Sequence, residues 1–389
     1  MGTGGRGPGR SFHRRAVSLV AGTLALAAVC GGCSSSGGAA TGPGASSGSV
    51  TVATGTAPSG AAPVPSAGCR TVAGRDEVAA GPAVTDQRVT VEVGGTQRWY
   101  LLDVPATDTP SPVPSAAGTA PGSAPRPLVL DFHGLAEGAT LHSATSRFGV
   151  LGQQDGFVVA FPNGTGSPVH WNTAQTGNPD LDFVTALLQQ VESTQCIDTS
   201  RVYASGFSDG AFFVSLLACT MSDRFAAIVA VSGLQLDRPC RTTRPVPILT
   251  FHGTADPILY FNGGVGTGTL NRLLGGGSGG SPTGSSTTTT LPKANLHGAG
   301  EPATVQAWAV KDGCDPHPTD TRQSSQIIVR RYACPVGTDV VFTIVLGGGH
   351  AWPGSRFSQK ISSLTGFTTF QVNATDDAWS FFRRFTLHR

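Results

Sequence analysis

Apolar residues recur along the chain in short runs with two kinds of spacing. The stretches RVTVEV (88–93) and RWYLLDV (98–104) predict an antiparallel hairpin across GGTQ. The stretches PLVLDFH (127–133) and FVVAF (157–161) are continuous apolar runs, which are typical of strands buried on both faces. Apolar residues at helical spacing in LDFVTALLQQVEST (181–194) predict an amphipathic helix.

The rest of the chain continues this alternation of strands and helices. Strands are predicted at 201–206, 226–233, 246–253, 326–333 and 339–346, and helices at 209–222, 301–313 and 375–386. Strands that alternate with helices favour a mostly parallel sheet covered by helices on both faces. The sequence therefore predicts one α/β domain over residues 67–389.

Stretches rich in Gly, Ser, Pro, Ala and Thr interrupt this pattern. Residues 34–66 have almost no large apolar side chains, so they cannot bury enough surface to offset chain entropy, and we expect a disordered linker. Residues 105–126 and 263–300 have a similar bias. We interpret both as surface insertions within the domain.

The N-terminus has the features of an export signal. Residues 1–15 carry four arginines and no acidic residue, and the apolar run AVSLVAGTLALAAVC follows. This run is too short for an ordinary membrane span. Two glycines and Cys33 come next, which resembles a bacterial lipobox in which Cys33 would be lipidated. We therefore predict a signal peptide over residues 1–33 and an exported protein, either secreted or held in the cell envelope by a lipid.

Charge and cysteine content narrow the possible partners. The chain has 26 basic and 24 acidic residues, and removal of residues 1–33 leaves 22 basic residues. This balance gives no basic surface for nucleic acid, and we expect membrane contact only through a lipid at Cys33. Six cysteines remain beyond Cys33, and an even number favours disulfides in an exported protein. None of them forms a C-x-x-C pair, so no metal site is predicted.

The pattern G-x-S-x-G occurs three times, around Ser46, Ser208 and Ser278. Ser46 and Ser278 lie in the low-complexity stretches, whereas Ser208 follows a predicted buried strand and precedes a predicted helix. Glycines on both sides permit the sharp turn that lifts a serine hydroxyl clear of a sheet. Ser208 is therefore predicted to be a nucleophile at a strand-to-helix elbow, the alternative being a serine that only caps the helix.

Two further residues follow later strands in the order that such a nucleophile requires. Asp256 comes just after a buried strand in VPILTFHGTADP, and His350 follows three glycines in TIVLGGGHAWPG. A serine needs a base to take its proton and an acid to orient that base. We predict Asp256 and His350 for these roles, although A-D-P is also ordinary turn chemistry and His350 could be a surface loop residue.

The same chemistry needs hydrogen-bond donors for the oxyanion. In the α/β-hydrolase arrangement, one donor is the backbone N–H after the nucleophile, here that of Asp209. The other comes from the loop after an early strand, which the stretch DFHGLAEG supplies, with Gly134 and Leu135 as the candidates. The insertion at 263–300 follows soon after Asp256, so we expect it to emerge at the rim of the site. Deletion of residues 270–298 tests whether it acts as a lid.

Together these motifs resemble the esterases related to poly(3-hydroxybutyrate) depolymerases and feruloyl esterases, including actinobacterial LpqC-like lipoproteins. The resemblance covers about residues 67–389 and is carried by HG (133–134), FPNGTG with HWN (161–172), RVYASGFSDGA, DRFAAIVAVSG, HGTADP and GGGHAWPG. It implies an α/β-hydrolase fold, a triad of Ser208, Asp256 and His350, and a substrate cleft lined by His133, Trp171 and Trp352.

The sequence departs from this family at two places. Asp209 stands where the family often has Ala or Asn, so an inward-pointing carboxylate would disfavour acidic substrates or raise the optimum pH. The loop HGLAEG is less glycine-rich than many, which leaves the second oxyanion donor open between Gly134 and Leu135.

The six cysteines allow several pairings, because spacing alone does not fix connectivity. Cys314 and Cys334 bracket a short segment between a helix and a strand, and the resemblance also favours this pair. The expected topology places Cys196 and Cys219 at the same end of the sheet, which leaves Cys69 with Cys240.

The sequence thus predicts an exported serine carboxylesterase or depolymerase that works without a metal or organic cofactor. The candidate substrates are polyhydroxybutyrate-type polyesters, feruloyl or acetyl esters on polysaccharides, and simple short-chain esters, and we expect a monomer. A different hypothesis is a surface lipoprotein that binds glycans or polymers on a hydrolase fold without turnover. A binding protein would not need the three triad residues, which favours the enzyme.

Overall fold

The computed structural model describes residues 62–69, 82–106, 109, 111–112, 124–274 and 291–387. The predicted signal peptide, Cys33, most of the linker and much of both insertions lie outside these residues. The described residues belong to one compact unit, Thr54–Arg389. Within them, no helix has the length and apolar character needed to cross a bilayer.

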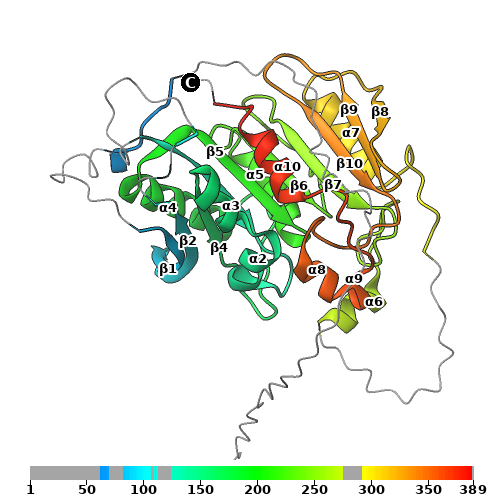
Figure 1. Cartoon of the computed structure of the whole chain (residues 1–389), viewed down its shortest axis with the longest axis horizontal. Coiled ribbons are helices and arrows are strands. Elements are labelled where there is room, and N and C mark those ends of the chain that lie inside the picture. Colours follow the sequence, from blue (N-terminus) through cyan, green and yellow to red (C-terminus); the bar gives the residue numbers. More distant parts are fainter. Residues whose placement is uncertain are drawn as a thin grey trace, which may run out of the picture. The chain divides into compact units, whose positions relative to one another are not determined.

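The domain is organised around a ten-stranded sheet (Figure 1). Its strand order is β1-β2-β4-β3-β5-β6-β7-β10-β9-β8, and the six strands from β4 to β10 run parallel. The strands are β1 (Val84–Val93), β2 (Thr96–Val104), β3 (Arg126–Phe132), β4 (Val158–Pro162), β5 (Ile197–Phe207), β6 (Ala227–Val231), β7 (Ile248–Gly253), β8 (Thr319–Arg322), β9 (Ile327–Tyr332) and β10 (Val340–Val345). The predicted mostly parallel sheet is therefore confirmed, with antiparallel pairs at both edges.

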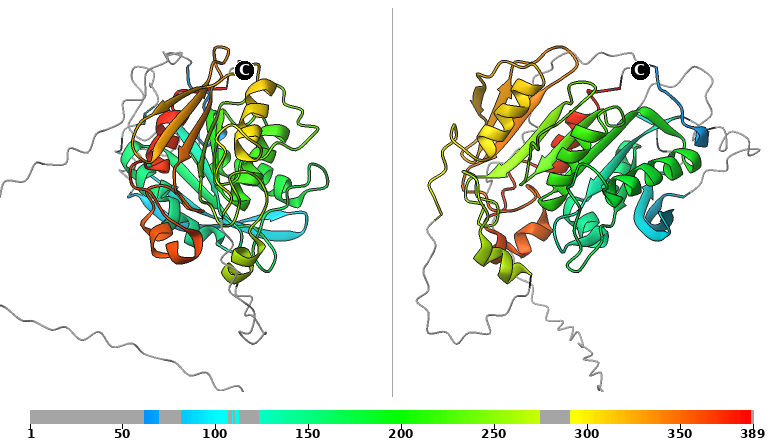
Figure 2. Two further views of the ribbon diagram at one scale, coloured as in Figure 1. Left: turned by 90° about the vertical axis from the view of Figure 1, so that its right-hand side faces the viewer. Right: turned by 180° about the vertical axis from the view of Figure 1, so that it is seen from behind.

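Helices cover both faces of this sheet, as predicted. The helices α4 (Pro179–Thr194), α5 (Asp209–Thr220) and α7 (Glu301–Lys311) pack on one face, and α3 (Phe148–Asp155) and α10 (Ala374–Phe382) pack on the other. In Figure 1, α10 lies in front of the sheet. In the view from behind, α4 and α7 lie in front of it (Figure 2). Alternate residues of one strand serve the two cores: Leu128 and Leu130 belong to the first, and Val129 to the second. The α/β-hydrolase fold expected from the sequence is thus the fold of this chain.

Several short elements have no counterpart in the sequence prediction. These are α2 (Gly138–Ser146), α3, α6 (Thr267–Leu273), α8 (Arg356–Lys360), α9 (Ser362–Thr365) and the edge strand β8. The stretches GATLHSATS and FGVLGQQD carry few apolar residues at helical spacing, so periodicity does not detect α2 and α3. Their helical form depends on packing against the sheet.

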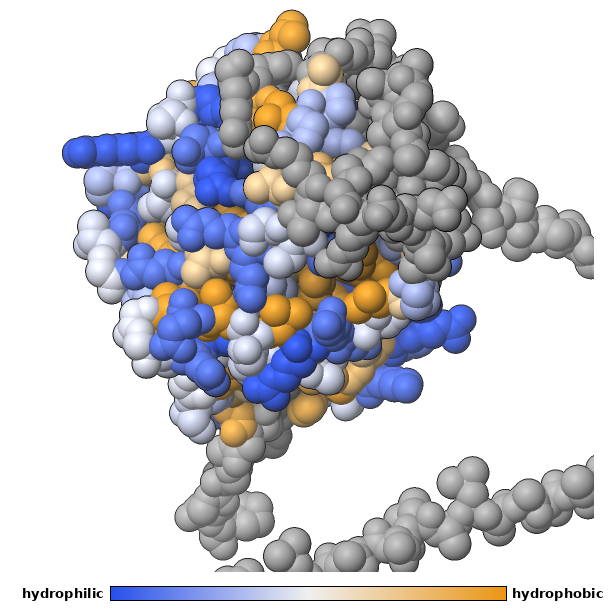
Figure 3. Space-filling model, turned by 90° about the vertical axis from the view of Figure 1, so that its left-hand side faces the viewer, coloured by the Kyte–Doolittle hydropathy of each residue, from blue (hydrophilic) through white to orange (hydrophobic). Residues whose placement is uncertain are grey.

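The predicted hairpin at the other edge of the sheet is present but has a tighter turn. β1 and β2 pair from Val93–Thr96 outward across only Gly94 and Gly95, both with positive φ. β1 lies at the sheet edge, and most of its side chains are exposed or half-buried and polar. The molecule seen from that side shows polar residues interspersed with smaller apolar areas (Figure 3). Charged and polar side chains at an edge strand oppose pairing with another chain.

The folded domain begins earlier than residue 67. Pro65 forms a β-bridge with Asp198, and Ser66 N–H donates to Ile197 O at 2.8 Å. Residues 62–66, which the sequence analysis places in the linker, therefore run beside the start of β5. Their composition hides this pairing because it uses backbone groups rather than large apolar side chains.

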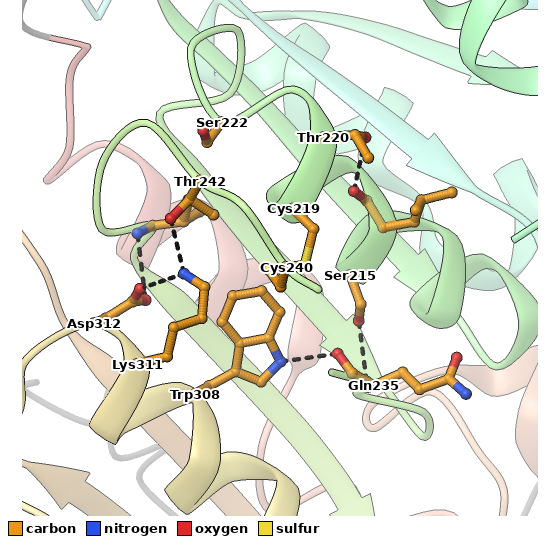
Figure 4. Close-up of a disulfide and its surroundings, with 12 residues drawn as sticks. Ser215, Cys219, Thr220, Ser222, Gln235, Cys240, Thr242, Trp308, Lys311 and Asp312 are labelled. Atoms are coloured by element: carbon orange, nitrogen blue, oxygen red, sulfur yellow. Dashed lines mark hydrogen bonds and ion pairs between the residues drawn. A yellow bond between two sulfur atoms is a disulfide. The ribbon is translucent and has the colours of Figure 1, made fainter. Parts of the chain in front are cut away.

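The disulfides correct two of the three predicted pairings. Cys314–Cys334 is present as predicted, but Cys69 pairs with Cys196 and Cys219 with Cys240. Residues 62–66 deliver Cys69 to the start of β5, where Cys196 lies. The loop between β6 and β7 returns to the end of α5, where it is also held by a hydrogen bond from Trp308 Nε1 to Gln235 O (Figure 4). Three disulfides fit an exported protein.

Candidate active site

Ser208 occupies a strained turn between β5 and α5. Its φ of 54° and ψ of −114° are rare for a residue with a side chain. A Cβ on Gly206 would lie 2.3 Å from Gly210 O, and a Cβ on Gly210 would lie 2.2 Å from Phe132 O. Only glycine fits at these two positions, so the chain passes close to itself on both sides of the serine. This is the elbow geometry that the sequence predicted around Ser208.

Asp256 and His350 meet although 94 residues separate them. Asp256 follows β7, His350 follows β10, and these two strands are parallel neighbours, so both loops leave the same edge of the sheet. His350 Nδ1 lies 2.8 Å from Asp256 Oδ2 in a buried pair. The other carboxylate oxygen accepts the backbone N–H groups of Ile258 and Leu259, both at 2.8 Å. Donation from Nδ1 leaves Nε2 of His350 as the nitrogen that can accept a proton.

Ser208 and His350 line one cavity of about 410 Å³. The hydrogen bonds found among the described residues do not include one between these two side chains, and geometry of this kind often tightens only when substrate binds. The remaining walls are largely apolar: Leu135, Leu141, Phe207, Phe212, Ile258, Leu259, Val265, Leu270, Phe357 and Ile361. An ester with an apolar acyl group suits such a cavity.

Backbone hydrogen bonds around the cavity distinguish between the candidate oxyanion donors. Asp209 is the first residue of α5, so its N–H has no partner within the helix. The N–H of Gly134 instead donates to Glu137 Oε2 at 2.8 Å. Gly134 is therefore occupied, and Leu135, which lines the same cavity, is the remaining candidate from this loop.

The side chains of His133, Trp171 and Trp352 do not line this cavity, which corrects the cleft expected from the resemblance. They are at most 3% exposed. Trp171 stacks on Phe213 in the core and donates from Nε1 to His133 O at 2.9 Å. Trp352 packs edge-on against the ring of Phe207 and donates to Thr375 Oγ1 at 3.0 Å. Both tryptophans contact a residue that lines the cavity: Trp352 packs against Phe207, and the backbone N–H of Trp171 donates to Asp209 Oδ2.

Apart from Leu135, the apolar residues that form the walls were not predicted from the sequence. Leu141 belongs to α2, Leu270 to α6 and Phe357 to α8, all elements without a periodic apolar signal. Figure 1 shows α6, α8 and α9 side by side below the sheet. The one usable signal was position, because the insertion that begins at residue 263 was expected at the rim and contributes Val265 and Leu270.

Known proteins resemble this chain in the region that contains Ser208. Residues 143–238, which include Ser208 but make up less than half of the chain, match the prolyl oligopeptidase family. The putative esterase NocK of Nocardia uniformis subsp. tsuyamanensis is 30% identical over 265 residues, which cover 66% of this chain and 74% of NocK. The chain belongs to this esterase family.

Further relatives of this chain carry feruloyl esterase names. Feruloyl esterase B of Piromyces equi is 28% identical over 240 residues, which cover 59% of this chain. The chain spans only 40% of the length of that relative. The solved structure of acetyl xylan esterase from Aspergillus awamori matches with a TM-score of 0.47 and 16% identity, covering 72% of this chain and 97% of that one.

Proposed function

We propose that this esterase hydrolyses carboxylic esters, with Ser208 as nucleophile, His350 as general base and Asp256 as the acid that orients it. One observation carries the proposal: a strained serine and a carboxylate-paired histidine line the same cavity. The membership of the chain in an esterase family gives independent support.

In this mechanism His350 Nε2 accepts the proton of Ser208 as Oγ attacks the ester carbonyl carbon. The charge that develops on the carbonyl oxygen is stabilised by the N–H groups of Asp209 and Leu135. Collapse of the tetrahedral intermediate expels the alcohol, which takes the proton from His350, and leaves an acyl group on Ser208. Water, activated by His350, then releases the acid and restores the serine.

The lining of the cavity favours a neutral, apolar acyl group. Most residues that line the cavity with Ser208 are apolar, and the carboxylate of Asp209, which also lines it, would repel an acidic acyl chain. Feruloyl esters and hydroxyalkanoate polyesters both fit this description, and feruloyl esterases are among the relatives. We propose such esters as the substrate class.

The site of action is also part of the proposal. We infer a signal peptide over residues 1–33 and a lipid attached to Cys33, which would place the enzyme in the cell envelope. The three disulfides support an exported protein. Metabolic labelling with an alkyne fatty acid, with Cys33→Ala as control, tests the lipid. Label that persists in Cys33→Ala would contradict attachment at this cysteine.

The first experiment measures hydrolysis of 4-nitrophenyl acetate, butyrate and octanoate by a protein of residues 34–389 in which the disulfides are formed. Ser208→Ala should lower kcat by about 10³-fold or more, because the remaining donors and binding contacts cannot replace the nucleophile. Circular dichroism and thermal unfolding establish that the variant is folded. Activity that survives in folded Ser208→Ala would overturn the assignment of the nucleophile.

A further inference from the structure

The loop that carries the candidate oxyanion donor Leu135 is held in an unfavourable conformation. Ala136 has a φ of 63°, which costs energy for a residue with a side chain, and its N–H donates to Val169 O at 2.8 Å. The loop passes close to the nucleophile, since a Cβ added to Gly134 would lie 3.4 Å from Ser208 Cβ. Such a loop keeps its shape only if its surroundings hold it.

The Glu137 carboxylate supplies that restraint, and both of its oxygens are in use. Oε2 accepts the N–H of Gly134 at 2.8 Å, and Oε1 accepts the hydroxyl of Thr145 at 2.6 Å. Glu137 lines the cavity, yet it has no oxygen without a protein partner. It is therefore better placed to hold the loop than to bind substrate.

A buried histidine joins Glu137 to the central sheet. His142 of α2 has no exposed surface; its Nδ1 lies 3.1 Å from Glu137 Oε2 and its Nε2 lies 3.0 Å from Asp131 Oδ2. The second contact has an ion-pair distance without the angle of a hydrogen bond. Asp131 belongs to β3, so the row Asp131, His142, Glu137 and Gly134 runs from the sheet to the loop.

The charges in this row reinforce one another. Burial alone would lower the pKa of His142, but the carboxylates of Asp131 and Glu137 raise it to about 10. Burial alone would raise the pKa of Glu137, but the charge and hydrogen bond of His142, with those of Thr145 and Gly134, lower it to about 2. An ionised carboxylate accepts a backbone N–H more strongly than a neutral group does.

We propose that Glu137, held by His142 and Asp131, is a positioning residue that binds the Gly134 N–H and thereby directs the Leu135 N–H toward the oxyanion. The proposal extends the ester hydrolysis proposed above. Transition-state stabilisation, rather than substrate affinity, then depends on a carboxylate that does not touch the substrate.

Glu137→Ala tests this, with Glu192→Ala as matched control. Glu192 of α4 forms an ion pair with Arg224, and neither residue lines the cavity. Loss of an aligned oxyanion donor costs about 10²-fold in kcat. We expect a decrease of this order for Glu137→Ala, a KM within about twofold of wild type, and parallel weakening of a trifluoromethyl ketone that forms a tetrahedral adduct with Ser208. Glu137→Gln, whose amide oxygen can still accept the Gly134 N–H, should recover part of the loss.

Hydrogen exchange separates this proposal from the proposed function. Peptides that span residues 131–138 should exchange faster in Glu137→Ala than in Glu192→Ala, whether or not the chain hydrolyses esters. If Glu137→Ala does not fold, Thr145→Val, which removes one contact to the carboxylate, is measured in the same way. Unchanged exchange and kcat in the folded variant, or a raised KM with unchanged kcat, would overturn the positioning role. A wild type without esterase activity would count against the proposed function alone.

Discussion

Asp209 combines two roles that the sequence could not separate. Its backbone N–H faces no helical partner, and its carboxylate accepts the N–H of Trp171 at 2.8 Å. Burial raises the pKa of Asp209, although the hydrogen bond from Trp171 opposes the shift. Because the residue lines the cavity, the charge of its carboxylate acts on whatever binds beside Ser208.

We predict that Asp209→Asn improves the hydrolysis of anionic esters. Asparagine keeps an oxygen for the Trp171 N–H but removes the charge, which is expected to change the binding of an anion by about 1 kcal/mol, or about fivefold. The measurement is the ratio of kcat/KM for mono-4-nitrophenyl succinate to that for 4-nitrophenyl butyrate at pH 8. Asp182→Asn, an exposed aspartate of α4 outside the cavity, is the control. An equal ratio in both variants would show that Asp209 does not act on the acyl group.

At the scale of elements, α6 provides a wall that the parallel sheet cannot. The short β-bridge between Leu259 and Val265 and the hydrogen bond from Gly266 N to Ile258 O tie its approach to the loop after Asp256. From there Val265 and Leu270 face the cavity. Leu270 is therefore the contact at which the influence of the insertion on substrate size can be tested.

We predict that Leu270→Ala shifts the acyl-length preference toward short chains. Removing part of an apolar wall weakens contact with a long acyl chain by about 1 kcal/mol and leaves acetate little affected. The measurement compares kcat/KM for 4-nitrophenyl octanoate and acetate, where the ratio should fall about fivefold. Leu364→Ala, a partly exposed leucine of α9 outside the cavity, is the control. A ratio that stays constant would argue against α6 as a determinant of substrate size.

At the scale of the whole molecule, two buried histidines tie stability to pH. His142 lies between Asp131 and Glu137. His252 lies near Glu301 of α7 and Asp256 after β7, with Nε2 2.8 Å from Leu259 O. Burial alone would lower the pKa of His252, but Glu301 and Asp256 raise it to about 9. Both histidines therefore stay protonated in the folded chain at pH values where an unfolded histidine is neutral.

We predict that the free energy of unfolding decreases as pH rises from about 6.5 to about 10. In this window the folded chain binds more protons than the unfolded chain. His252 contributes up to about pH 9 and His142 up to about pH 10, each with a decrease of up to about 1.4 kcal/mol per pH unit. Glu137, with a lowered pKa of about 2, acts in the opposite direction: its contribution is present above about pH 4.5 and is lost as pH falls toward 2. Urea unfolding at pH 5.5, 7.5 and 9.5 measures the slope, which should be shallower in His142→Gln. Stability that is constant from pH 6.5 to 9.5 would contradict protonation of these histidines.

The sequence alone determined the alternation of the main strands and helices and the edge of the sheet at which Ser208, Asp256 and His350 lie. Continuous apolar runs such as β3 and β4 must be buried on both faces, and their alternation with helices leaves few alternatives to a parallel sheet. Ser208, Asp256 and His350 each follow a strand of that sheet, so their meeting at one edge could be predicted from local signals alone.

Tertiary structure decided everything that depends on which segments meet across the fold. Cys69 reaches Cys196 because residues 62–66 pair with β5, a backbone contact with no apolar signal in the sequence. The cavity walls come from short helices whose conformation depends on packing, and the tryptophans expected there are drawn into the core because burying a large ring is more favourable than exposing it. The choice between Gly134 and Leu135 likewise depended on one carboxylate, Glu137, whose direction is fixed by a histidine and an aspartate brought to it by the fold.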